Sequence, residues 1–224
     1  MENKKKSSSN FTLISHFLML FFLISICIWD RINNIPKFPY NFIYLTQIDL
    51  YINMIYYTLI LIKDLKKQNP KNFDKFFNFC FSFSFNAFIM YWLIYFNNSK
   101  NLFKSNIKLP FFLVFSLHGG VFLINILEAT IINKRKNTKT ISLFYYVFLA
   151  VIYPFFLRFV YFNYGIKSYP FIKKKFLYVF LIVFFSLFVC ILGHFLYVFL
   201  SNFNVNNENE DDESELIFID NEEN

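Results

Sequence analysis

A row of polar residues interrupts an apolar stretch that is long enough to cross a membrane. Residues 42–62 are mostly Ile, Leu, Tyr and Met, yet they include Thr46, Asp49 and Asn53. On a helix these three positions (i, i+3 and i+7) share one face. Because a carboxylate inside a bilayer costs at least ~2.5 kcal/mol, we expect this face to point into a helical bundle.

Polar residues also interrupt the other apolar stretches of the chain. Residues 109–132 carry His118, Asn125 and Glu128 on or near one helical face. Further intramembrane polar side chains come from the remaining stretches: His16, Ser82, Asn86, Arg158, Ser186 and His194. Intramembrane ionisable residues normally pair with one another or line a cavity, so they are functional candidates by default.

Thr46 and His118 are expected to lie at matched depth. Both predicted helices enter the membrane from the same side, with Thr46 about seven and His118 about nine residues in, which is ~10–14 Å below the surface at 1.5 Å per residue. Gly119 and Gly120 follow the histidine and permit close helix approach. The two side chains can therefore meet across a helix interface.

A hydroxyl beside an imidazole predicts nucleophilic chemistry. The histidine takes the hydroxyl proton as the oxygen attacks. Asp49 or Asn53 would orient the imidazole, as the third member of a triad does, and backbone amides near Gly119 are a candidate oxyanion hole. The reaction would be acyl transfer or ester hydrolysis on a substrate dissolved in the bilayer. Spacing alone does not choose between His118 and His194 as the base.

A proton or ion pathway uses the same types of residue. Asp49, Glu128 and Arg158, together with two histidines, could form a relay. A small proton-coupled transporter is therefore the alternative function, as is a non-catalytic multi-pass membrane protein. Against a transporter, the sequence shows no inverted repeat and no pair of interrupted helices.

The elements that must position these residues are six apolar blocks. The chain has 224 residues, of which 56% are hydrophobic and 17% are charged, and a helix needs ~20 apolar residues to span ~30 Å of hydrocarbon. The blocks are too long and too uniformly apolar for barrel strands. We expect an all-α integral membrane bundle of six transmembrane helices within residues 1–203, at roughly 11–29, 42–62, 76–96, 109–132, 141–162 and 176–200.

Charged residues predict the orientation of this bundle. The N-terminal tail and the loops at 63–75 and 133–140 carry twelve Lys and Arg, against nine in the loops of the opposite side. This bias favours both termini in the cytoplasm. Residues 204–224 hold nine acidic residues and no basic ones, which predicts an acidic, disordered cytoplasmic tail.

Several functional classes find no support in the sequence. The basic clusters sit in short loops beside the spans, where they set topology and contact lipid headgroups, so no nucleic-acid partner is expected. The cysteines Cys27, Cys80 and Cys190 fall within predicted spans without metal-ligand spacing, so neither a metal nor a cofactor is expected. No mitochondrial presequence is visible, which favours the endoplasmic reticulum or the plasma membrane.

Three segments, taken in order, carry a family resemblance. They are "YLTQIDLYINMIYYTLILIKDL" at 44–65, "FFLVFSLHGGVFLINILEA" at 111–129 and "GIKSYPFI" at 165–172. The first resembles the Y-L-T-x-x-D-L segment of the androgen-induced gene family of multi-pass membrane threonine hydrolases, which includes the androgen-dependent TFPI-regulating proteins. The second resembles that family's fourth helix, and the third resembles its G-x-x-x-Y-P-F loop.

The resemblance implies a function and two catalytic residues. Members of this family cleave fatty acid esters of hydroxy fatty acids with a Thr nucleophile and a His partner, which by resemblance are Thr46 and His118 here. A lipid in the bilayer would be the substrate, and no cofactor is implied. The chain departs from the family pattern at Gly119 and Gly120, where β-branched or other apolar residues are usual, and this departure bears on the substrate range.

Overall fold

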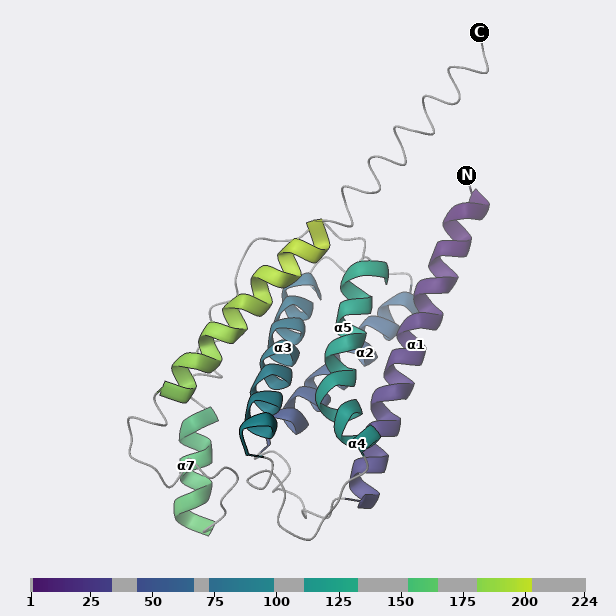
Figure 1. Cartoon of the computed structure of the whole chain (residues 1–224). Helices are drawn as coiled ribbons and strands as arrows, with labels where there is room; N and C mark the ends of the chain where they lie inside the picture. The colour runs from purple at the N-terminus through teal and green to yellow at the C-terminus, as the bar shows by residue number, and fades with distance from the viewer. Residues whose placement is uncertain are drawn as a thin grey trace.

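The computed structural model of this chain describes six segments: residues 2–33, 44–66, 73–98, 111–132, 153–164 and 181–202. Within them every residue is helical except Tyr44 and Lys66. The helices are α1 (Glu2–Asn33), α2 (Leu45–Leu65), α3 (Phe73–Asn98), the run α4 (Phe111–Phe115), η3 (Ser116–Gly120), α5 (Val121–Leu127) and η4 (Glu128–Ile132), α7 (Tyr153–Tyr164) and a C-terminal helix at Leu181–Asn202. The described part of the chain is therefore all-α (Figure 1).

Five of the described helices are long and apolar enough to cross a membrane. These spans are Asn10–Ile32, Leu45–Leu65, Phe73–Leu93, Phe111–Thr130 and Leu181–Asn202. They confirm the integral membrane fold that the apolar blocks predict. Of the predicted span at 141–162, the structure describes only the part that belongs to α7, and residues 141–152 lie outside the described residues. Residues 204–224 lie outside them too, so the acidic tail stays a prediction.

The helices are apolar outside and more polar inside. On α1 the exposed side chains include Phe11, Ile14, Phe17 and Phe21, whereas His16 on the same helix is buried. Such an arrangement suits a lipid solvent, because lipid tails accept apolar side chains at no cost while polar groups must find partners within the protein.

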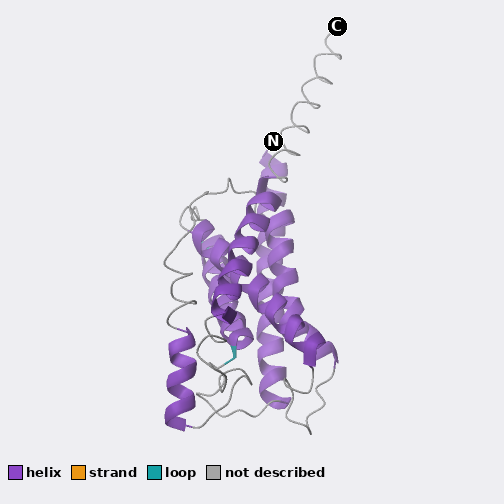
Figure 2. Ribbon diagram, turned by 60° about the vertical axis from the view of Figure 1, so that its left-hand side comes forward, coloured by secondary structure: helices purple, strands orange, loops and turns teal. Residues whose placement is uncertain are grey.

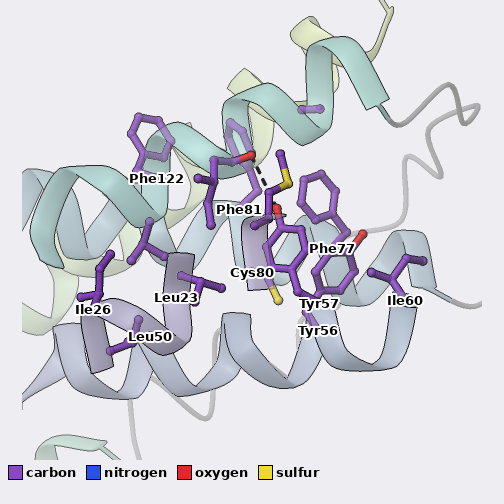
Figure 3. Close-up of a cluster of buried hydrophobic side chains, with 14 of the residues drawn as sticks. Leu23, Ile26, Leu50, Tyr56, Tyr57, Ile60, Phe77, Cys80, Phe81 and Phe122 are labelled. Carbon is purple, nitrogen blue, oxygen red and sulfur yellow. Dashed lines mark hydrogen bonds between the residues drawn. The ribbon is translucent and has the colours of Figure 1, made fainter. Parts of the chain in front are cut away.

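The centre of the bundle is formed by α3 and the helix over residues 111–132. In each of these two spans 61% of the apolar window is buried, against 22% in α1. Figure 1 shows α1 and α2 beside this pair and the C-terminal helix alongside α3. Figure 2 shows the helical bundle from a second direction. Aromatic rings fill the core, where Phe81 packs edge-on against Phe122 at 5.5 Å (Figure 3). Phe77 packs against Tyr197 at the same distance.

Glycine allows the C-terminal helix to approach α3 closely. A Cβ atom built on Gly193 would lie 3.1 Å from the Cα atom of Ser82 and 3.0 Å from the ring of Phe85. Polar bonds flank this contact, since Asn86 donates to the hydroxyl of Ser186 at 2.8 Å. The absence of a side chain at Gly193 therefore fixes how deeply the C-terminal helix docks.

Candidate active site

His118 lies in a widened turn of its helix. The backbone is α-helical at Phe111–Phe115, π-helical at Ser116–Gly120 and α-helical again from Val121. Single π turns are rare and occur frequently at functional sites, because the extra residue displaces side chains from the regular helical face. The π turn thus presents His118 and the buried Gly119 within the bundle.

The imidazole of His118 contacts one aromatic ring closely. The rings of Tyr91, on α3, and His118 lie parallel, with centroids 3.3 Å apart and planes inclined by 8°. Among the described residues, the buried Nδ1 atom of His118 has no hydrogen-bond partner, and neither does the buried hydroxyl of Tyr91. Buried polar groups are nearly always hydrogen-bonded. Two unpaired polar atoms on stacked rings therefore make this position a candidate functional site.

The register of the helices follows from their hydrogen bonds. Between α2 and the helix over 111–132, bonds join Asn53 to Asn125 and Tyr56 to Glu128. Because a later residue of α2 bonds to a later residue of the other helix, the two helices run parallel. Tyr57 also donates to Asn125 at 3.1 Å. The bonded pairs are 68 to 72 positions apart.

This register puts Thr46 level with residues 114–118. Thr46 is half-buried in the first turn of α2, and α2 contacts the π turn that contains His118. No described residue forms a hydrogen bond with the Thr46 hydroxyl. In this register Thr46 and the π turn lie at similar depths, and α2 packs against the π turn.

Asp49 and Asn53 belong to a polar network next to this level. The hydroxyl of Ser84, on α3, donates to Asp49 Oδ1 at 2.7 Å, and Asn53 Nδ2 lies 2.9 Å from the same oxygen. Asn125 Nδ2 in turn donates to Asn53 Oδ1 and to Ser84 Oγ, both at 2.8 Å. Asp49 thus bonds to Ser84 and Asn53, and the network as a whole ties three helices together through Asn125.

Gly119 and Gly120 face phenylalanine rings. A Cβ atom on Gly119 would lie 3.2 Å from the ring of Phe115, one turn earlier, and one on Gly120 would lie 3.0 Å from the ring of Phe22 on α1. Gly120 therefore permits the close approach of α1 to the π turn, in agreement with the role that small residues play between membrane helices.

The other two histidines have polar partners. His16 bonds through Nδ1 to Asp64 and through Nε2 to Glu128 Oε2 at 3.0 Å. His194 Nδ1 lies 2.8 Å from Asn78 Nδ2, on α3. His194 is thus bonded to α3 at a separate polar contact of the bundle, whereas His118 is the histidine that shares a level with Thr46.

Sequence reasoning missed several members of these networks. The sequence predicts a loop at 63–75, which includes Asp64, but this residue belongs to the last turn of α2. Ser84 and Tyr57 are not singled out from the sequence either, although Tyr57 lies one turn after Asn53 on the polar face of α2. Nothing in the sequence singles out Tyr91 among fifteen tyrosines, because its contact depends on how α3 crosses its neighbour.

A metal centre has no counterpart in the residues that the structure describes. There, no group of three or more His, Cys, Asp or Glu side chains is arranged to hold an ion. Cys27, Cys80 and Cys190 are free thiols.

The fold and the site together define a multi-pass helical membrane protein with a buried polar centre. The FAR-17a/AIG1-like protein family model matches residues 11–205, and the chain therefore belongs to that family, which is the androgen-induced gene family. Comparison with curated proteins and with solved structures gave no match.

Proposed function

We propose that this protein is an intramembrane lipid ester hydrolase that cleaves fatty acid esters of hydroxy fatty acids, with Thr46 as nucleophile and His118 as base. The observation that carries the proposal is a half-buried imidazole whose buried Nδ1 atom has no hydrogen-bond partner among the described residues, at the level of Thr46, in a member of this family. The lipid would reach the site from the bilayer, and no cofactor takes part.

The proposed reaction has two steps. Thr46 Oγ1 attacks the ester carbonyl carbon while a ring nitrogen of His118 takes the hydroxyl proton. The bond to the leaving oxygen then breaks, and His118 passes the proton to the departing hydroxy fatty acid. Water, deprotonated by His118, hydrolyses the acyl-Thr46 ester and releases the fatty acid, which restores both residues.

Asp49, Asn53 and Gly119 support the pair in this proposal. The bonds of Asp49 and Asn53 to Ser84 and Asn125 hold the start of α2 against its two neighbours. That arrangement keeps Thr46 at the level of the π turn. The backbone amides near Gly119 are the candidate donors to the developing oxyanion.

Hydrolysis by the purified protein in lipid nanodiscs tests the proposal. Release of fatty acid from a branched ester of a hydroxy fatty acid is compared among wild type, Thr46→Ala, Thr46→Ser and His118→Ala. His194→Gln is the matched control, because it alters an intramembrane histidine bonded to Asn78. A fluorophosphonate probe, followed by peptide mass spectrometry, locates the nucleophile.

The expected pattern is specific. Activity and probe labelling disappear in Thr46→Ala, hydrolysis is lost in His118→Ala, and both persist in Thr46→Ser and His194→Gln. Full hydrolysis by a well-folded Thr46→Ala variant, or a probe adduct on another residue, contradicts the assignment.

A proton-coupled transporter is the second candidate, and the His16 cluster favours it. Asp64 is partly exposed, whereas Glu128 is fully buried, and His16 bonds to both. Tyr56 donates to Glu128 at 3.3 Å and extends this chain inward. For this candidate, proton uptake into proteoliposomes must depend on His16 and Glu128 and be indifferent to Thr46→Ala.

We further propose that the protein resides in the endoplasmic reticulum or plasma membrane with both termini cytoplasmic. The basic bias of the loops supports this orientation. Protease protection of epitope tags at the two ends in sealed microsomes tests it, and protection of either tag from external protease contradicts it.

A further inference from the structure

The closest ring contact in the described part of the protein is made by the candidate base. The imidazole of His118 lies flat on Tyr91, at 3.3 Å between centroids. The other ring pairs of this region are looser, for example Phe88 on Phe122 at 5.3 Å and Tyr91 on Tyr95 at 6.0 Å. The contact of Tyr91 with His118 therefore differs from ordinary aromatic packing in this core.

Tyr91 also lies at the level of the proposed nucleophile. Ser84 donates to Asp49 and accepts from Asn53, and Tyr56, further along α2, packs against Phe77, earlier on α3. The two helices therefore run antiparallel. Ser84 is also bonded to Asn125, on the helix over 111–132. Tyr91 lies seven positions after Ser84, and His118 lies seven positions before Asn125. The antiparallel register thus brings Tyr91, His118 and the first turn of α2 to one level.

A catalytic imidazole needs a fixed ring plane. In a triad, a hydrogen bond from a third group holds the histidine in orientation. Here the buried Nδ1 atom of His118 has no such partner among the described residues. Terminal torsions of histidine are broad, so without another restraint the ring would rotate out of line with its nucleophile.

We propose that Tyr91 is a positioning residue for His118, whose aromatic face fixes the plane of the imidazole. The stacked face takes over the role that a carboxylate plays in other triads. It also suits the proton transfer, because an aromatic face attracts a cation and so favours the imidazolium that forms. This inference rests on the proposed function for its catalytic consequence, but not for the restraint on the ring itself.

The restraint is measured independently of catalysis. Diethyl pyrocarbonate modifies accessible imidazoles, and mass spectrometry gives the rate at His118 in the folded protein. Tyr91→Met removes the ring at similar volume, Tyr91→Phe keeps the ring without the hydroxyl, and Phe88→Met is the matched control on the same face of α3. We expect about a tenfold faster modification in Tyr91→Met, since the ring no longer covers the imidazole, and rates within twofold of wild type in the other two.

The catalytic consequence follows from the same variants. A misplaced base costs up to about 100-fold in rate, so kcat should fall by about 10- to 100-fold in Tyr91→Met while KM stays within twofold. Tyr91→Phe should retain wild-type kcat, because it preserves the stacked face. Tyr91→Leu replaces the Met variant if the latter is not monodisperse on size exclusion.

Each outcome bears on the proposal. An unchanged rate of His118 modification in Tyr91→Met overturns it, whatever the activity. Equal loss of kcat in Tyr91→Phe and Tyr91→Met also overturns it, since the hydroxyl and not the face would then matter. If the modification rates behave as expected while Thr46→Ala retains full activity, the positioning of His118 holds and the proposed hydrolase function fails.

Discussion

His16 and His118 lie within the same bundle in opposite surroundings. Both nitrogens of His16 meet carboxylates, Asp64 on α2 and Glu128 on the helix over 111–132, so this side chain joins three helices. His118 has an unpaired Nδ1 atom and a ring stacked on Tyr91. An unpaired polar atom is costly in a membrane interior. The satisfied histidine thus links helices of the fold, while the unsatisfied one is the histidine that the proposed function uses as a base.

The largest expected effect is on activity. Thr46→Ala and His118→Ala should each lower hydrolysis by about 10³-fold or more, because nucleophile and base act as one unit. The double variant should be no worse than either single variant, which initial rates in nanodiscs will show. Fully additive losses would break the assignment of the two residues to one step.

The next effect is on stability and belongs to His16. His16→Ala leaves two carboxylates without their shared partner, and breaking a buried ion pair costs about 3–5 kcal/mol. His118→Ala removes no hydrogen bond in the described structure, so its free energy of unfolding should fall by less than half as much. Reversible unfolding in mixed micelles measures both, and equal losses would erase the contrast between the two histidines.

A smaller effect is expected in the polar network of α2 and α3. Ser84→Ala removes the bond donated to Asp49 Oδ1 and the two accepted from Asn53 and Asn125. Hydrogen bonds between membrane helices average about 0.6 kcal/mol, and the largest reach about 1.7 kcal/mol. Unfolding in micelles should register a loss in this range, with KM unchanged. A collapse of kcat in a variant of wild-type stability would instead place Ser84 in the catalytic machinery.

The smallest effect concerns the contact between the two regions. In Gly120→Ala the new methyl group meets the ring of Phe22 at about its closest tolerable distance, 3.0 Å. This ring belongs to α1, the helix of His16, and can move aside, so we expect a loss below about 1 kcal/mol. Gly193→Ala is the comparison, because there the methyl group also meets the Cα atom of Ser82, at 3.1 Å, and backbone cannot yield as a ring does. A greater loss in Gly120→Ala would mean that Phe22 is fixed.

Local patterns explain why so much of the fold could be predicted. The length of an apolar run is set by the bilayer, so the spans containing Thr46 and His118 were found within a few residues of their helices. Depth is likewise a matter of counting along a helix, so the level of each residue could be predicted without knowledge of the helix crossings. Ionisable residues such as Glu128 stand out because lipid penalises them.

Contacts that depend on helix crossings could not be predicted. Tyr91 reaches His118 through the rotation of α3 about its axis, which no local spacing encodes. The sequence predicts a loop at Asp64 because a charge near the end of a span is usually solvated, whereas in the structure this residue is in the last turn of α2 and bonds to His16. Asp49 was expected beside the imidazole, yet the structure bonds it to Ser84 and Asn53.

The π turn at Ser116–Gly120 makes the length of its helix a functional quantity. An α-helix advances about 100° per residue, so one extra residue within a turn rotates everything before it relative to everything after it. The inserted residue therefore sets the direction of the exposed rings of Phe111 and Phe112 relative to Asn125, which bonds to Asn53 on α2. Deleting a single residue from the turn would rotate the helix before the turn relative to the helix after it. The exposed rings and Asn125 could then no longer both keep their present directions, even with every side chain of the site still present.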